Sequence, residues 1–144
     1  MAIDSSMSPT LNYMRLAMKT YKYNHRSRIE EFEALYNNFE YLFDPSFYGF
    51  EIGPGWFEII ADFVIKTDRH VTSYPDKFTD FRIFQVKEKF GGLRIYVHDQ
   101  DLYLNSVIAQ AERDAYLACT ICGNRVYQSL GFGAQMCEEH FNMF

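Results

Sequence analysis

Two consecutive stretches near the N-terminus carry apolar side chains at three- and four-residue intervals, the spacing of one buried helix face. The first comprises Leu11, Met14, Met18, Tyr21 and His25, and the second comprises Ile29, Phe32, Tyr36, Phe39 and Phe43. Ser27 and Glu30 have the spacing of a capping box at the start of the second helix, and Asp44-Pro45 ends it. The pattern predicts an antiparallel helical pair over residues 9–43.

Further along the chain, the period of the apolar positions changes from helical to alternating. A third helical stripe comprises Trp56, Ile59, Ile60, Phe63 and Val64. Between residues 81 and 98, apolar and polar side chains alternate around Gly91-Gly92, which predicts a β-hairpin. A last helix is expected from about Asp101, with the stripe Leu104, Val107, Ile108, Ala111 and Ala115. We therefore expect a single α+β domain, residues 1–144, with helices packed on the hairpin in a core at 53–118.

The C-terminal segment, residues 119–144, contains the pattern C-x2-C-x14-C-x2-H, formed by Cys119, Cys122, Cys137 and His140. Two closely spaced ligand pairs are typical of tetrahedral zinc, and a glycine directly after Cys122 suits the sharp turn of a zinc knuckle. We expect a treble-clef-like arrangement that holds one zinc ion. Four protein ligands leave no open coordination position, so the zinc is expected to be structural.

Two alternatives to zinc remain open at this stage. In the first, the three thiols, which are all the cysteines of the chain, are reduced and packed as small apolar groups, and His140 is exposed. Redox chemistry at Cys119 and Cys122 is the other, but no thioredoxin-like strand and helix precede them. The four histidines fall in no H-E-x-x-H or nucleophile motif, so we expect no catalytic residues and no enzyme.

The net charge of −5 is unevenly distributed along the chain. Residues 1–29 hold five basic residues and one acid, whereas residues 30–62 hold eight acids and neither Lys nor Arg. One interpretation is mutual neutralisation across the helical pair, with Lys22 near Glu33 and Arg15 near Glu40. The others are a basic nucleic-acid face on the first helix, and an acidic stripe that imitates a phosphate backbone. That stripe would comprise Glu30, Glu33, Glu40 and Asp44.

The predicted hairpin carries a local basic patch, Lys87, Lys89 and Arg94, around Phe90. It is either a solvated hairpin end or an anchor for an acidic partner group. Because the chain is acidic overall, we expect this patch and the zinc end to form one protein-directed surface, with nucleic acid as the alternative partner. The first 20 residues lack the apolar region of a signal peptide, and no apolar run approaches ~18 residues. We therefore expect a cytoplasmic protein without a membrane partner.

Several of these motifs together resemble a group of small uncharacterised proteins of bacteriophages and bacterial genomes, over about residues 53–140. They are Gly55-Trp56, the Q-V-K-E-K-F-G-G-L-R-I-Y run at 85–96, Ala111-Glu112 and the Cys/His pattern. Members often have Ser where this chain has Asp114. The resemblance implies a phage or prophage setting and a zinc-binding C-terminal end. With no catalytic set, the expected function is binding of a host or phage macromolecule, such as inhibition of a host defence in the host cytoplasm.

Overall fold

A three-stranded sheet forms the centre of the chain, whose computed structural model describes residues 28–126 and 135–142. Strands β2 (Arg82–Lys89) and β3 (Gly92–His98) form the predicted antiparallel hairpin. Strand β1 (Phe50–Glu51) pairs in parallel with β2, which gives the order β1-β2-β3. This short strand was not predicted, because residues 44–55 have no regular spacing of apolar side chains.

The hairpin turn lies one residue earlier than predicted. Phe90 and Gly91, with φ of 53° and 81°, are its central residues, and Lys89 pairs with Gly92. Positive φ at both central positions is what a two-residue type I′ turn requires. Gly92 therefore belongs to β3, where the guanidinium of Arg94 packs over it: a Cβ there would lie 2.7 Å from Arg94 Nη1.

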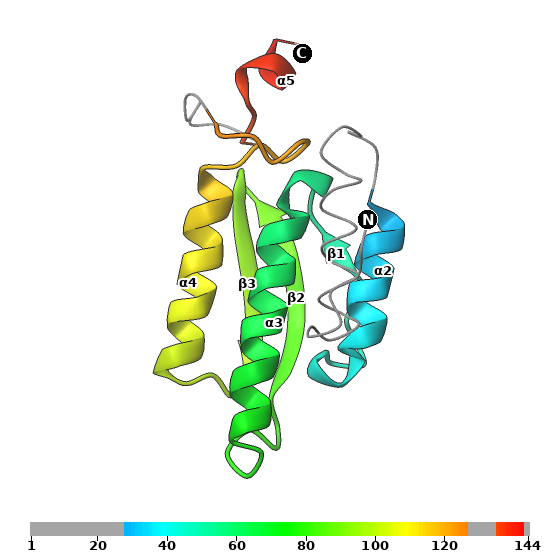
Figure 1. The fold of residues 1–144 in the computed structure, drawn as a ribbon, viewed down its shortest axis with the longest axis vertical. Helices are drawn as coiled ribbons and strands as arrows, with labels where there is room; N and C mark the ends of the chain where they lie inside the picture. The colour runs from blue at the N-terminus through cyan, green and yellow to red at the C-terminus, as the bar shows by residue number, and fades with distance from the viewer. Residues whose placement is uncertain (1–27, 127–134, 143–144) are drawn as a thin grey trace, which may run out of the picture.

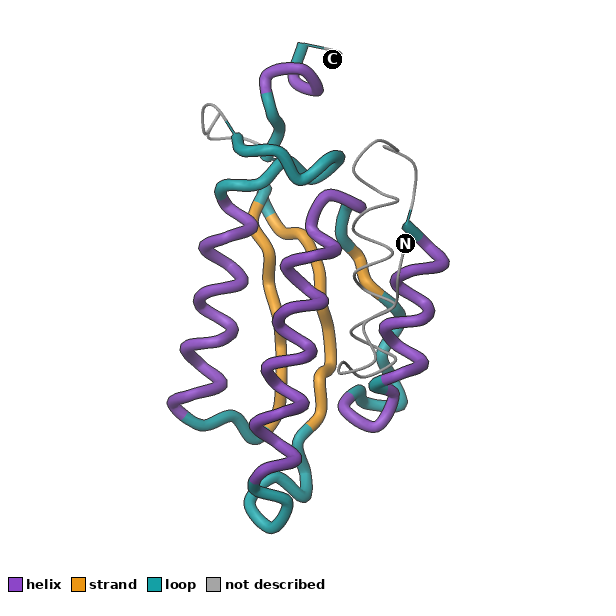
Figure 2. The backbone as a smooth tube through the Cα atoms, in the orientation of Figure 1, coloured by secondary structure: helices purple, strands orange, loops and turns teal. Residues whose placement is uncertain are grey.

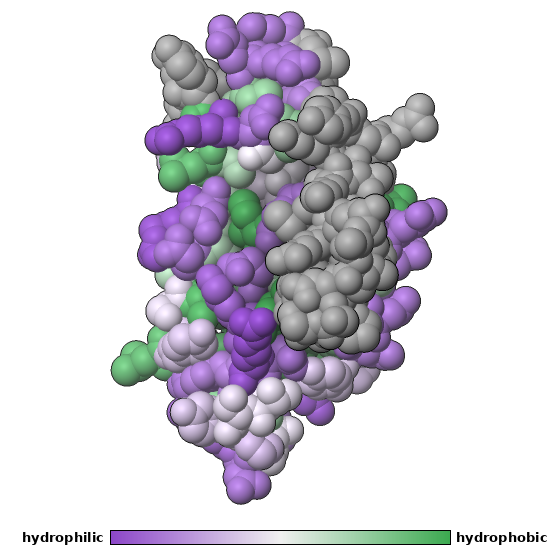
Figure 3. Space-filling model, viewed as in Figure 1, coloured by the Kyte–Doolittle hydropathy of each residue, from purple (hydrophilic) through white to green (hydrophobic). Residues whose placement is uncertain are grey.

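The helices pack on one face of this sheet. Helices α3 (Phe57–Ser73) and α4 (Leu102–Tyr116) lie side by side in front of the strands (Figure 1), and a tube through the backbone shows the same two layers (Figure 2). The predicted stripes are the buried ones: Ile60, Phe63 and Val64 in α3, and Leu104, Val107, Ala111 and Ala115 in α4. Their other sides form a mostly hydrophilic surface (Figure 3). The α+β class and the helices packed on the hairpin are thus confirmed.

Helix α2 (Ile29–Asn38) is shorter than predicted and packs beside the first turns of α3. It ends at Asn38, and a separate 3-10 turn follows at Glu40–Leu42, so one continuous helix to Phe43 is wrong. Ile29 is 60% exposed, although the stripe predicted it to be buried. The capping residue predicted for α2 and the whole first helix, with Arg15 and Lys22, lie outside the described residues, so their pairing stays a prediction.

The early end of α2 separates the four acids of the predicted stripe. Glu30 and Glu33 are exposed on α2, whereas Glu40 lies in the 3-10 turn and Asp44 lies beyond it. Asp44 instead closes a local turn, in which its carboxylate accepts hydrogen bonds from the Ser46 hydroxyl and amide. These bonds hold the pKa of Asp44 below its ordinary value. The four acids therefore do not lie on one helix, and their imitation of a phosphate backbone stays a prediction.

Asp101 joins the end of α3 to the start of α4. Its Oδ1 accepts a hydrogen bond from the Leu104 amide at 2.9 Å, which caps α4, and its Oδ2 lies 2.7 Å from His70 Nε2 and 3.0 Å from Lys77 Nζ. Burial opposes ionisation here, but these three donors hold the pKa of the Asp101 carboxyl well below its ordinary value. The carboxylate therefore contributes to stability wherever it is ionised in the folded chain.

Replacing this carboxylate should give a pH-dependent loss of stability. Asp101→Ala should lower the free energy of unfolding by about 1 kcal/mol or more at pH 5, since it removes a helix cap. Asp101→Asn keeps a capping oxygen but no charge. Because the folded-state pKa is depressed, the advantage of wild type over Asp101→Asn should be full above about pH 4 and should shrink as the pH falls below it. Urea unfolding of the wild type and both variants at pH 5 and pH 2.5 measures these differences in the free energy of unfolding. A difference between wild type and Asp101→Asn that does not change with pH would contradict the charge effect.

Candidate functional site

The first ligand pair of the Cys/His pattern lies in a tight turn directly after α4. The Ile121 amide donates to Cys119 Sγ and the Asn124 amide donates to Cys122 Sγ, both at 3.4 Å. The chain reverses at Gly123, whose φ is 79°, and the Cys119 amide then donates to the Asn124 carbonyl at 2.7 Å. Amides aimed at both sulfurs are the geometry of a zinc knuckle, as the glycine after Cys122 predicts.

The second pair comes from the short helix α5 (Glu138–Phe141). Cys137 is the residue before its first turn and His140 lies within it, so both side chains project from one end of the helix. The amide of Thr120 donates to the carbonyl of Gln135 at 2.8 Å, which ties the two pairs together. His140 is 3% exposed, so the alternative in which it is a solvated surface residue does not hold.

The four ligand atoms converge on one point. All lie within 4.8 Å of one another. The sulfurs of Cys122 and Cys137 are 3.7 Å apart, and His140 Nδ1 lies 3.5 Å from Cys119 Sγ and 3.2 Å from Cys137 Sγ. Tetrahedral zinc, with bonds of about 2.3 Å to sulfur and 2.0 Å to nitrogen, places such atoms about 3.5–3.8 Å apart. The cluster therefore fits a metal ion of this kind.

The two thiols of the knuckle differ in acidity. Burial opposes ionisation of Cys119, but surrounding hydrogen bonds, including that from the Ile121 amide, hold its pKa below the ordinary value. Burial, together with the neighbouring Cys119, raises the pKa of Cys122 to about 12. A metal that binds here must displace the Cys122 proton, so metal binding releases protons into solution.

A glycine-rich turn packs against the knuckle from the other side, a contact that the sequence did not predict. The amide of Gly55 donates to the Thr120 carbonyl at 2.8 Å, and a Cβ on Gly55 would lie 2.0 Å from the Cys119 oxygen. The fully buried Trp56 donates from Nε1 to the Ala118 carbonyl at 2.9 Å. The spacing of Gly53, Gly55 and Trp56 was the available signal, because adjacent small residues permit close approach of two backbones.

The basic hairpin patch lies at the same end of the molecule as the knuckle (Figure 1). Phe90 at its tip is 90% exposed, so burial of this ring beneath the turn is excluded. Lys87 and Arg94 are directly opposite each other on β2 and β3, and Lys89 is exposed. Glu88 lies between the two lysines, and burial raises the pKa of its carboxyl. Glu88 is paired with the buried Leu93, so its side chain lies on the opposite face of the hairpin from Lys87 and Arg94.

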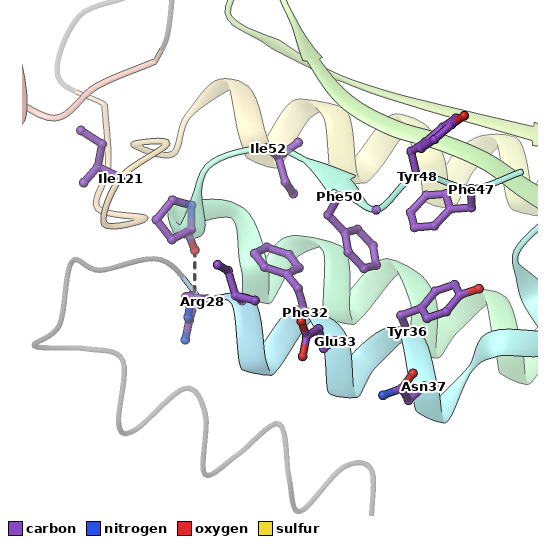
Figure 4. Close-up of a pocket in the computed structure, with 13 residues that line it drawn as sticks. Arg28, Phe32, Glu33, Tyr36, Asn37, Phe47, Tyr48, Phe50, Ile52 and Ile121 are labelled. Atoms are coloured by element: carbon purple, nitrogen blue, oxygen red, sulfur yellow. Dashed lines mark hydrogen bonds between the residues drawn. The ribbon is translucent and has the colours of Figure 1, made fainter.

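A groove of about 670 Å³ lies between α2 and the segment that contains β1. Phe32, Phe50 and Ile52 form its apolar wall, and Arg28 closes one end by donating to the Pro54 carbonyl (Figure 4). The buried Arg28 also pairs with Glu58 at 2.6 Å, so its charge is already neutralised. Of the predicted acidic residues, Glu33 alone lines this groove.

Comparison of the chain with family models, with curated proteins and with solved structures returns no match. In the part of the chain that the structure describes, no helix is long and apolar enough to cross a membrane.

Proposed function

We propose that Cys119, Cys122, Cys137 and His140 hold one structural zinc ion in a treble-clef-like C-terminal segment. Three thiolates and an imidazole suit zinc better than magnesium or calcium, which prefer oxygen ligands. Four protein ligands complete a tetrahedral site without water, whereas catalytic zinc keeps a position open. The ion would fix α5 to the knuckle and, through Gly55, to the start of α3.

We further propose that the protein is non-enzymatic and acts by binding a host or phage macromolecule in the cytoplasm, at the end that the zinc stabilises. Inhibition of a host defence would be one result of such binding. The observation that supports recognition at this end is Phe90. A large aromatic ring at a hairpin tip, with 90% of its surface exposed, is suited to fill a pocket in a partner.

The backbone of Phe90 strengthens this argument. Phe90 has a φ of 53°, in the left-handed region, which costs a residue with a Cβ roughly 1–2 kcal/mol relative to the right-handed region. Asn or Gly is preferred at this position of the turn. Folding alone therefore favours a different residue here. Strain of this sort gathers at functional sites. The ring of Phe90 also has Lys89 Nζ 5.9 Å from its centre, so a cation accompanies it.

Phe90→Asn should separate stability from binding. The variant should unfold at equal or higher denaturant concentration, gaining about 1 kcal/mol, because Asn tolerates the turn better than Phe. It should also lose about 2 kcal/mol of binding free energy, roughly 30-fold in affinity, if Phe90 is a central contact. The measurement is capture of partners from host-cell lysate, followed by the dissociation constant of the purified partner for both chains.

Leu102→Ala is the matched control, because Leu102 is 87% exposed but lies at the start of α4, at the opposite end of the sheet (Figure 1). It should bind the partner like wild type. A partner that binds wild type and Phe90→Asn equally would refute recognition at the hairpin tip.

A further inference from the structure

We propose that the face of the sheet turned away from α3 and α4 binds single-stranded nucleic acid through aromatic side chains and flanking cations. This inference rests on the proposed function, since it names the partner of a binding protein. The face is that of β2 and β3 turned away from α3 and α4. Val86, Leu93 and Ile95 point to the helices and are buried, so their strand neighbours point the other way.

Aromatic rings lie on the half of this face that is farther from the hairpin turn. Tyr96 is 43% exposed and stands opposite Gln85, and Phe84 is 41% exposed. The strand register shifts between Ile83 and Gln85, so Phe84 occupies a bulge that turns its ring outward while Ile83 stays fully buried. The ring of Phe84 meets the exposed His98 edge-on, with centroids 6.2 Å apart. Exposed rings on an open sheet are platforms on which bases stack.

Cations lie on the half of the same face that is nearer to the hairpin turn. Lys87 and Arg94 are paired directly across the strands, although like charges in that position destabilise a sheet. Within residues 28–126 and 135–142, neither has a carboxylate within ion-pair distance. Glu51 is the acid opposite Lys87 on β1, and its carboxylate accepts a hydrogen bond from Gln85. With Lys89, the half of the face near the hairpin turn carries three cations against that one acid.

This arrangement fits a phosphate backbone with unstacked bases better than it fits a duplex. Side chains two residues apart on a strand are about 7 Å apart, so Arg94 and Tyr96 can contact a phosphate and its neighbouring base. Exposed rings on an open sheet can stack on splayed bases, whereas the bases of a duplex are already stacked on each other. The net charge of −5 opposes long-range attraction, so we expect modest affinity that depends on contact with this face.

The test is fluorescence anisotropy of labelled 12-nucleotide dT and U oligomers with the zinc-loaded full chain, against a duplex of equal length. We expect saturable binding of the single strands at low salt and weaker binding of the duplex. Three phosphate contacts predict a slope of log affinity against log salt of about −2. Tyr96→Ala should weaken binding about tenfold, since loss of one stacked base costs roughly 5- to 150-fold. Arg94→Ala should make the salt slope shallower by about 0.7.

Matched controls come from the helix side, where Arg113→Ala and Tyr116→Ala on α4 should leave the affinity unchanged. No saturable binding at low salt, or equal losses in the α4 variants, would overturn the inference. If a protein partner still depends on Phe90 in that case, the proposed function survives and the partner is a protein. If neither the oligomers nor any Phe90-dependent partner binds, both proposals fail.

Discussion

Chelation of the metal should release Trp56 from its buried position, and zinc should restore it. Trp56 is the single tryptophan of the chain and donates to the Ala118 carbonyl, the residue directly before the first ligand. Its emission therefore reports whether the knuckle is in place. Metal analysis of protein purified without added zinc should give about one equivalent. A chelator should then shift the Trp56 emission to longer wavelength, because the indole gains contact with water.

Cys122→Ser should reproduce the chelated state in the absence of any chelator. The free energy of structural zinc binding is on the order of 10 kcal/mol and is coupled to folding, so loss of one thiolate removes a large part of it. We expect loss of amide protection from residues 119–126 and 135–142, while the hairpin and α4 keep theirs. Glu139→Gln, an exposed change between Cys137 and His140, should behave like wild type. The zinc proposal would be refuted if freshly purified protein contained no metal and its Trp56 emission did not change on addition of a chelator.

Patterns in the local sequence predicted the elements whose buried face follows a regular period along the chain. The stripe of α4 follows the helical period from Leu104 to Ala115, so burial of that face needs no knowledge of its partner. The cluster of Cys119, Cys122, Cys137 and His140 was also predictable, because each pair lies within four residues and two such pairs are typical of a tetrahedral metal site. These predictions depend on spacing alone.

Non-local contacts decided what the patterns missed. Strand β1 has two residues and pairs in parallel with a strand more than thirty residues away, which no local period reveals. The hairpin turn was misplaced because turns at 90–91 and 91–92 leave every strand residue on the same face, so alternation does not distinguish them. Which face of the hairpin is exposed depends on α3 and α4 packing on the same side of the sheet, which the alternation within each strand does not determine.

Gly55→Ala should destabilise the chain severely, although it adds one methyl group. The new Cβ would lie 2.0 Å from the Cys119 oxygen and 2.6 Å from the Gly123 nitrogen, and both are backbone atoms of the knuckle. Neither can rotate away, so the turn at Gly53–Trp56 or the knuckle must move. Overpacking of this kind costs about 3 kcal/mol. Gly92→Ala is the control, because its Cβ meets the far end of the flexible Arg94 side chain, which can shift.

The metal should determine how much of that cost is measured. The proposed zinc ion would hold the knuckle in the conformation that clashes with the new methyl group, so the loss of stability should be larger in the zinc-loaded chain than in the chelated one. By linkage, the difference between the two losses must equal the loss in zinc-binding free energy, with about 1.4 kcal/mol for each tenfold change in affinity. Urea unfolding with zinc and with chelator gives the first quantity, and competition with a chromogenic chelator gives the second. Equal losses in both states would show that Gly55 packs against a knuckle that is already formed without metal.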